Sequence, residues 1–300
     1  MCCMKIGYFG DGPWAHEAFK KIIADNTLQI GFVVVRYDSQ DQTLIRLAEQ
    51  NGIAVKVHPN INSEEFISSI KQYDIDIFVS MSFNQIFKKE LINFPPYKTI
   101  NCHAGKLPFY RGRNILNWVL INDESEFGIT VHYMDEGIDT GDIILQEVYP
   151  ITDDDDYGTL LSRAYKGCAD ILYRAIKMMQ ENRIEPIKQQ KIDPIGMYCG
   201  MRQEGDEIIN WNQTSREIFN FIRALAMPGP CATAWIRGRK IYINRSKMIP
   251  GAHRYKNIPG QVIGKTKEGF LVKTQDTMIE VVEYLYEGKI KVGDRLVSHE

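Results

Sequence analysis

The sequence predicts an α/β protein with a Rossmann-like, doubly wound, mostly parallel sheet in the N-terminal domain and a smaller, OB-like β-barrel in the C-terminal domain. Two observations support this. Strand-like apolar runs alternate with amphipathic helical runs through the first part of the chain, as in a parallel sheet covered by helices. From about residue 192, short strand-like pieces follow one another closely, which is typical of a small barrel. We expect a catalytic domain over 1–190, a linker and connecting helix over 191–225 and a β-rich domain over 226–300.

The expected elements of the first domain alternate between strand and helix. Strands are expected over residues 5–10, 30–38, 53–58, 74–82 and 98–103, and helices over 15–25, 43–52 and 63–74. A pair of strands over 128–134 and 142–151 then precedes a long helix from about Tyr157 to Met179. The acidic run Asp153–Asp156 at the start of that helix fits helix capping better than metal binding.

The second domain is expected to open with a capped helix within residues 211–225. Short strands should follow over 231–237, 240–246, 260–266, 269–274 and 277–285, separated by turns rich in Gly, Lys and Asp.

Composition excludes several classes of protein. A chain of 300 residues with 44% hydrophobic and 25% charged residues is typical of a soluble protein of two domains. Its net charge of -2 gives no general basis for binding nucleic acid or a bilayer. No apolar stretch approaches the ~18 residues of a membrane span, and the N-terminus lacks the pattern of a secretion signal.

The six cysteines are scattered without the spacing of a zinc site or a disulfide framework, so we expect a cytoplasmic protein with no metal. Cys102 lies between two polar residues, but strand alternation turns it to the opposite face, as expected for a buried hydrophobe rather than a nucleophile.

Three polar residues stand at strand ends or in a tight turn. Asn101 and His103 are two apart at the end of an apolar run, so their side chains should share one face of a strand. Asp139 lies in the glycine-rich turn over residues 135–142, where its carboxylate could be held against the imidazole. Singly, each has an ordinary structural explanation; together they favour an active site. His132, within the following strand, is expected to be structural, and His16 to cap a helix.

Three ordered motifs cover the segment from Asn101 to Asp142: Asn101-x-His103, then Leu107-Pro108-x-Tyr110-x-Gly112, then D-x-G-x-D-T-G-D over 135–142. With them the chain resembles the folate-dependent formyltransferases, which act on methionyl-tRNA, glycinamide ribonucleotide or nucleotide-linked amino sugars. The runs IINWNQTSREIFNFIRAL, PGPCATAW and PGQVI resemble the junction and C-terminal barrel of the tRNA and sugar branches. Gly105-Lys106 departs from the Ser-Leu that many members carry.

The resemblance implies transfer of a formyl group from N10-formyltetrahydrofolate to an amine, and the residue chemistry fits. The reaction needs a base for the amine proton and a donor for the developing oxyanion. His103 titrates in the neutral range and suits the base. Asn101 suits the oxyanion donor, an effect worth roughly 3 to 4 kcal/mol in a preorganised site. Asp139 would orient His103.

The folate is expected beside the segment 82–87, since ligands of such sheets bind outside the carboxyl ends of the strands. The residues nominated to contact it are Ser82, Phe83, Ile86, Asp135 and Ile138.

The first turn offers a competing interpretation. Gly10-x-Gly12-x-x-Ala15, followed by Asp38 at the end of the next strand, nearly matches the dinucleotide fingerprint of a nicotinamide-dependent oxidoreductase. Pro13 removes an N–H donor, however, and Asp11 brings negative charge to the supposed phosphate site. A substrate-facing turn explains the glycines equally well.

The acceptor is expected to be a UDP- or dTDP-linked amino-dideoxy sugar destined for a surface glycan. In the tRNA branch the second strand-to-helix connection is long and basic, whereas here it is only residues 36–42, with two aspartates. Nucleic acid is therefore not expected as a partner, and methionyl-tRNA is the alternative acceptor. A basic strip over residues 237–247 could face RNA, but alternating charges on edge strands favour solvated surface. A homodimer through the small C-terminal domain is the expected assembly. The nominated substrate contacts are Trp14, Gly105, Lys106, Tyr110, Arg111, Arg202 and Trp211.

Overall fold

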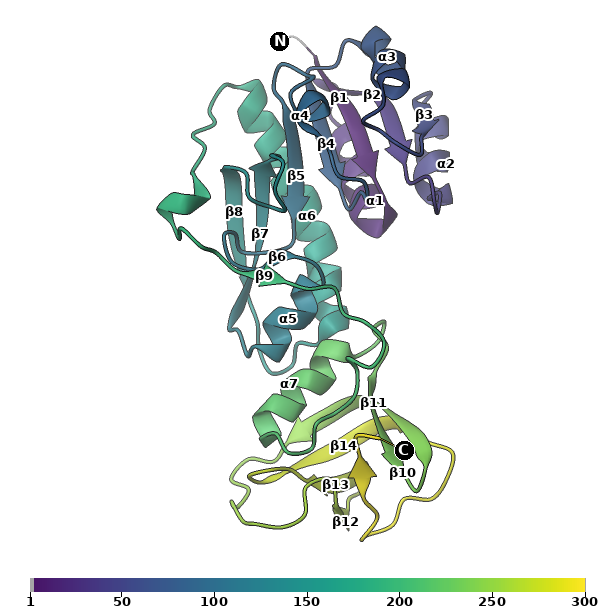
Figure 1. Ribbon diagram of the computed structural model, residues 1–300, viewed down its shortest axis with the longest axis vertical. Helices are drawn as coiled ribbons and strands as arrows, with labels where there is room; N and C mark the ends of the chain where they lie inside the picture. The colour runs from purple at the N-terminus through teal and green to yellow at the C-terminus, as the bar shows by residue number, and fades with distance from the viewer. Residues whose placement is uncertain (1–2, 300) are drawn as a thin grey trace. The chain divides into compact units, whose positions relative to one another are not determined.

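A computed structural model describes residues 3–299 (Figure 1). The chain groups into two compact units. The first comprises residues 1–112, 127–149 and 162–199, and the second comprises 113–126, 150–161 and 200–300. Each unit is assembled from three separate segments of the chain, so its boundaries differ from the continuous domain ranges expected from the sequence. Those ranges stay a prediction. No helix among the described residues is long and apolar enough to cross a membrane.

The first unit is built on a seven-stranded sheet in the order β3-β2-β1-β4-β5-β7-β8. The order reverses direction between β1 and β4, as in a doubly wound sheet. Neighbouring strands from β3 to β5 pair in parallel, and β7 pairs with β5 antiparallel. The strands are β1 (Met4–Gly10), β2 (Leu28–Val35), β3 (Ala54–Val57), β4 (Ile77–Met81), β5 (Thr99–His103), β7 (Glu126–Tyr133) and β8 (Ile143–Pro150).

Helices cover both faces of this sheet (Figure 1). On one face, α1 lies beside α6, where Tyr173 donates a hydrogen bond to Asp25. On the other, α3 and α4 pack on an aromatic cluster around Phe9 and Phe78. The helices are α1 (Gly12–Ile23), α2 (Gln42–Gln50), α3 (Glu64–Ile70), a 3₁₀ turn (Lys71–Tyr73), α4 (Lys89–Ile92), α6 (Tyr157–Gln180), which begins in the second unit, and a second 3₁₀ turn, η2 (Gln189–Lys191).

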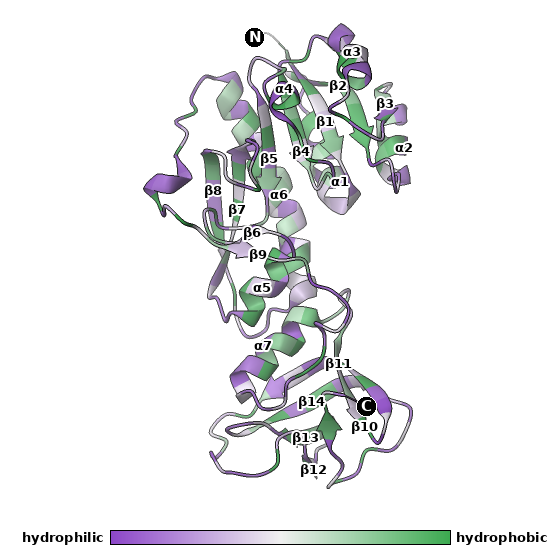
Figure 2. Cartoon of the chain, viewed as in Figure 1, coloured by the Kyte–Doolittle hydropathy of each residue, from purple (hydrophilic) through white to green (hydrophobic). Residues whose placement is uncertain are grey.

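Local sequence explains these helix starts. Ser63 accepts a hydrogen bond from the amide of Phe66 to cap α3, and Asp41 accepts from Thr43 and Leu44 to cap α2. Before α6, the Asp156 carboxylate accepts from the amide of Thr159, so this part of the acidic run engages the helix start. Figure 2 shows that hydrophobic residues concentrate in the strands and that many residues of the connecting loops are hydrophilic.

The second unit is a six-stranded antiparallel sheet in the order β12-β13-β14-β11-β10-β15. Helix α7 (Ser215–Leu225) begins with a capping box between Thr214 and Glu217 and packs on this sheet. The unit also contains α5 (Ile115–Ile121). Its strands are β10 (Ala232–Ile236), β11 (Arg239–Met248), β12 (Val262–Lys265), β13 (Phe270–Lys273), β14 (Met278–Leu285) and β15 (Leu296–Val297). The predicted fold class is therefore confirmed.

Candidate active site

The end of β5 sets the two predicted polar residues on one face. Asn101 lies opposite His132 of β7 in the antiparallel register, and His103 lies opposite Thr130. Because side chains alternate along a strand, Asn101, His103 and His132 project to the same side, and Cys102 projects away into the core. Burial raises the pKa of the Cys102 thiol, which suits the structural role expected for it.

The turn after β7 is wound tightly around its own side chains. The Asp135 carboxylate accepts hydrogen bonds from the amide of Gly137 and from the hydroxyl of Thr140. A Cβ on Gly141 would lie 1.8 Å from the carbonyl oxygen of Tyr133, so only glycine fits there. Asp139 adopts a left-handed φ of 55°, a conformation that costs free energy in a residue with a Cβ. The turn is thus constrained around this residue.

The Asp139 carboxylate lies between two imidazoles. One oxygen, Oδ2, lies 3.5 Å from Nδ1 of His103, and the other, Oδ1, lies 3.5 Å from Nε2 of His132. Oδ2 also accepts a hydrogen bond of 2.9 Å from the amide of Gly112, in the short parallel pair β6 (Arg111–Gly112) and β9 (Tyr198–Cys199). Burial acts to raise the pKa of this carboxyl, but the two histidines and the Gly112 amide outweigh it, so the net pKa is lowered. Asp139 is therefore ionised.

The other nitrogen of His103 lies against the backbone. Nε2 is 2.7 Å from the carbonyl oxygen of Tyr110, which can only accept, so Nε2 carries a proton in this conformation. Gly105 makes the approach possible, because a Cβ there would lie 2.4 Å from Nε2 and 2.5 Å from the Tyr110 oxygen. Gly105, one of the two residues that depart from the Ser-Leu of many family members, therefore lies directly against the candidate imidazole.

His132 belongs to this cluster although the sequence favoured a purely structural role. It is 2% exposed, and its Nδ1 lies 2.8 Å from the carbonyl oxygen of Tyr133, so Nδ1 is the donor. Its Nε2 faces both the Asn101 amide nitrogen at 3.3 Å and the Asp139 carboxylate at 3.5 Å. The Asn101 amide is therefore held beside this ring. Only the strand register, which the sequence does not reveal, brings His132 here.

The residues nominated for folate divide by exposure. Ile86 and Ile138 are 74% and 59% exposed, one after β4 and the other in the turn that carries Asp139. Phe83 instead packs on Phe9 with ring centroids 5.6 Å apart. Ser82 adopts a left-handed φ of 60° at the point where the chain leaves β4. The Asp135 carboxylate is occupied within its own turn, as described above.

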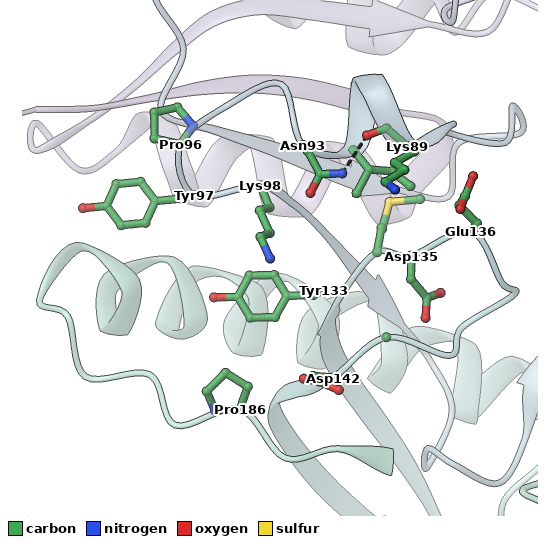
Figure 3. A pocket seen from close by; sticks show the side chains of 13 residues that line it. Lys89, Asn93, Pro96, Tyr97, Lys98, Tyr133, Asp135, Glu136, Asp142 and Pro186 are labelled. Atoms are coloured by element: carbon green, nitrogen blue, oxygen red, sulfur yellow. Dashed lines mark hydrogen bonds between the residues drawn. The ribbon is translucent and has the colours of Figure 1, made fainter. Parts of the chain in front are cut away.

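A cavity of about 610 Å³ opens between the turn and the loop that leads into β5 (Figure 3). Its walls carry both charged and aromatic side chains. Lys98 reaches toward Tyr133 across it, and Asp135 and Glu136 border it. Among residues 3–299, no group of three or more His, Cys, Asp or Glu side chains is arranged to hold a metal ion.

The nominated substrate residues in the first unit are mostly turned inward. Tyr110 and Arg111 are each only 6% exposed, and the Arg111 guanidinium is hydrogen-bonded to Gln189. Lys106 is half-buried beside Gly128. Trp14 is half-buried and packs edge-on against Tyr165 at 4.5 Å. Of these side chains, Lys106 and Trp14 keep exposed surface that could meet a substrate.

Two nominated residues belong to the second unit. Trp211 is 3% exposed within that unit's hydrophobic core, so its ring is not available for stacking on a base. Arg202 is half-buried, and burial lowers the pKa of its guanidinium. Its backbone amide donates a hydrogen bond to Asn114.

The first turn does not offer the donors of a dinucleotide site. The amide of Gly12 donates to the Asp41 carboxylate at 2.7 Å, and His16 Nε2 contacts the same carboxylate at 2.6 Å. A phosphate would therefore meet a carboxylate where the fingerprint requires free amides. His16 binds the residue that caps α2, rather than capping a helix itself.

Residues 4–176 match the formyl transferase family, and residues 202–295 match the formyl transferase C-terminal domain. The chain belongs to the formyl transferase family. This confirms the expected resemblance, so the protein is an N-formyltransferase.

The proteins to which this formyltransferase is similar are of two kinds. A methionyl-tRNA formyltransferase from Geotalea daltonii is 29% identical over 99% of this chain and 96% of its own, and one from Syntrophus aciditrophicus is 33% identical over 82% of this chain and 78% of its own. Among solved structures, WlaRD, a sugar 3N-formyl transferase with dTDP and 5-N-formyl-THF, has a TM-score of 0.68 and 23% identity over 97% of this chain and 100% of its own. An N-formyltransferase from Helicobacter canadensis with folinic acid and dTDP-3-aminofucose has a TM-score of 0.68 and 24% identity, covering 95% of this chain and 100% of that one.

Gly105→Ala should disturb the formyltransferase site through the added methyl group alone. Since the new Cβ cannot coexist with the imidazole and the Tyr110 carbonyl in their present places, His103 or the loop must shift. We expect kcat to fall by about 10- to 100-fold, as for other small displacements of reacting groups. Gly200→Ala is the matched control, because nothing lies within 4 Å of the added Cβ. Equal steady-state kinetics for the two variants would contradict the prediction.

Proposed function

We propose that this enzyme formylates the amine of a UDP- or dTDP-linked amino-dideoxy sugar in the synthesis of a surface glycan. The observation that carries the proposal is the connection between β2 and α2. Its one basic residue, Arg36, donates hydrogen bonds to Asp38 at 2.7 and 3.1 Å and to Asp11 at 3.3 Å. The guanidinium lowers the pKa of Asp38 to about 2, so this carboxylate is ionised at neutral pH. The connection thus has no free cation for a tRNA backbone.

The likeness to two sugar N-formyltransferases, each matched over its whole length with a TM-score of 0.68, supports this proposal. The second unit's basic strip also has partners within the chain: Arg237 pairs with Asp294, Lys240 with Glu207, and Lys247 with Glu268. Such pairs reduce the charge available to RNA.

The proposed roles at the site follow from its contacts. His103 is the base that accepts a proton from the attacking amine at Nε2. For this step the ring must leave the Tyr110 carbonyl and carry its one proton on Nδ1, which faces Asp139, so that Nε2 offers a free lone pair. Asn101, held beside His132, directs an amide N–H toward the oxygen on which negative charge develops. Asp139, ionised between two histidines, orients His103 and stabilises its protonated form.

The residues present suit the folate. N10-formyltetrahydrofolate supplies the activated formyl group when bound. The aliphatic side chains of Ile86 and Ile138, exposed on two segments near the site, suit the faces of a flat ring. The carboxylates of Glu136 and Asp135, the latter through the oxygen that its own turn does not use, border the cavity in Figure 3 and are acceptors that suit a pterin's N–H groups. We infer that these segments hold the folate.

Methionyl-tRNA is the second candidate acceptor, and one observation favours it. The curated relatives at 29% to 33% identity over most of this chain are methionyl-tRNA formyltransferases. A tRNA enzyme should bind aminoacylated tRNA with an affinity that falls steeply as salt is raised.

The two acceptors are separated by one experiment. The purified enzyme is incubated with N10-formyltetrahydrofolate and either a panel of UDP- and dTDP-amino sugars or methionyl-tRNA, and products are read by the formyl mass increment. We expect formylation of at least one sugar, and at least 100-fold lower kcat/KM with methionyl-tRNA at low salt, about 2.7 kcal/mol of discrimination. Efficient methionyl-tRNA formylation with no sugar product would overturn the proposal.

A variant in the connection between β2 and α2 tests whether that connection contacts the small acceptor. Asp38→Asn removes a carboxylate from the connection without adding a cation, so it should leave sugar formylation within about twofold while weakening any repulsion of nucleic acid. If this change lowered formylation of the sugar by more than tenfold, the connection would instead contact the small acceptor.

A further inference from the structure

Gln189 is a buried amide placed behind the turn that carries Asp139. It lies in η2 and is 2% exposed. Its Nε2 donates two hydrogen bonds of 2.7 Å, one to the carbonyl oxygen of Asp139 and one to that of Gly141. Both N–H groups of the amide are therefore spent on the backbone of this one turn.

The oxygen of the same amide is committed to Arg111. Oε1 accepts from Nε of Arg111 at 3.0 Å and from Nη2 at 2.7 Å. The guanidinium also donates from Nη1 to the Ile195 carbonyl at 3.2 Å, and its Cζ lies 5.2 Å from the centre of the Tyr198 ring. Arg111 is thus held in place by several contacts, and its two hydrogen bonds to Oε1 fix the oxygen end of the Gln189 amide.

The segment around Gln189 is anchored on both sides. Ile187 forms backbone hydrogen bonds of 2.8 Å in each direction with Ile143, directly after the turn. Further along, β9 pairs in parallel with β6, whose Gly112 amide donates to the Asp139 carboxylate. The amide of Gln189 is therefore presented from a strap, residues 187–199, that is fastened to the sheet before it and to β6 after it.

We propose that Gln189 is a positioning residue for catalysis, which holds Asp139 in reach of His103. The proposal rests on the proposed role of Asp139 as the group that orients His103. Asp139 has a left-handed φ and would relax if its backbone were free. Fixing the carbonyls of Asp139 and Gly141 fixes the peptide plane that follows each of these residues. The first of these planes sets ψ of Asp139 and therefore helps to set the direction of the Asp139 side chain. A displacement of about 1 Å at such a group can cost 100-fold in rate.

Two substitutions separate this role from simple filling of the interior. Gln189→Met keeps the length of the side chain and removes every hydrogen bond. Gln189→Glu keeps an acceptor for Arg111 but turns a carboxylate oxygen toward two carbonyl oxygens, so only the link to the turn is lost. Gln190→Met, at the exposed neighbouring position, is the matched control.

The experiment measures kcat and KM for both substrates, with NMR of ¹⁵N-labelled imidazoles in the full-length enzyme. We expect Gln189→Met and Gln189→Glu to lower kcat by about 30- to 100-fold with KM changed less than threefold, and to shift the His103 nitrogen signals in the direction that Asp139→Asn shifts them. Gln190→Met should do neither. The NMR signals report the turn even if a variant is less stable.

The outcomes distinguish this inference from the proposed function. If Asp139→Asn lowers kcat but Gln189→Glu leaves kcat and the His103 signals as in wild type, Gln189 does not position the turn. If Asp139→Asn itself retains wild-type kcat, the proposed role of Asp139 fails first, and the inference fails with it.

Discussion

Replacing His103 with glutamine is expected to lower kcat by about 10³-fold while leaving KM for the folate within about threefold. Glutamine retains a hydrogen-bond donor near the Tyr110 carbonyl but cannot accept and release a proton in the neutral range. The loss should therefore appear in the chemical step. Single-turnover formylation with the best acceptor of the panel measures it directly, separated from product release.

The control for this variant is His253→Gln, a change at an exposed histidine of the second unit. It should retain wild-type kcat. Rate loss in His103→Gln that is recovered by raising the pH would indicate that the acceptor amine loses its proton to solvent and that the imidazole is dispensable. Retention of more than about a tenth of wild-type kcat would refute the role of His103 as base.

Several features of the fold could be predicted because they depend on local pattern. Alternation of buried strands and amphipathic helices specified the parallel sheet, and the helix expected from Tyr157 to Met179 runs from Tyr157 to Gln180. The pairing of Asn101 and His103 on one face followed from the two-residue period of a strand. These inferences needed no knowledge of which strands become neighbours.

Other features depend on tertiary register and could not be read from the sequence. His132 joins the site only because β7 runs antiparallel to β5 in one register, which places it opposite Asn101. Gln189 is far from Asp139 along the chain, and its position depends on the strap that follows α6. A search for polar residues at strand ends has no means of finding either.

The nominated substrate contacts show a further limit. Arg111 and Tyr110 lie in the motif between the candidate catalytic residues, yet Arg111 is buried by pairing with Gln189, and the Tyr110 backbone rather than its ring faces His103. From residue type alone, Arg111 was expected to contact a phosphate and Tyr110 to stack on a base or sugar. Burial, which depends on the whole fold, decides whether a side chain reaches a ligand.

Asp139→Asn is expected to lower kcat by about 10³- to 10⁴-fold, because the amide keeps the shape of the carboxylate but removes the charge beside His103. The amide can still accept from Gly112 through its oxygen, so the turn should remain folded. Rates are compared at saturating concentrations of both substrates. A decrease of less than tenfold would show that Asp139 does not support the imidazole electrostatically.

The same variant should also change how stability depends on pH. The pKa of Asp139 is lowered in the folded protein, so its ionised form adds stability above the unfolded-state value near 3.8 and loses that contribution as pH falls below it. The difference in free energy of unfolding between wild type and Asp139→Asn should therefore be larger just above a pH of about 4 than below it, and should narrow as the pH falls further. Urea denaturation from pH 3 to 7 measures this difference, with Asp154→Asn, at an exposed position, as the control. A difference that stayed constant over this range would mean that the two imidazoles do not stabilise the ionised carboxylate, and the charge-based explanation of the kcat loss would fail with it.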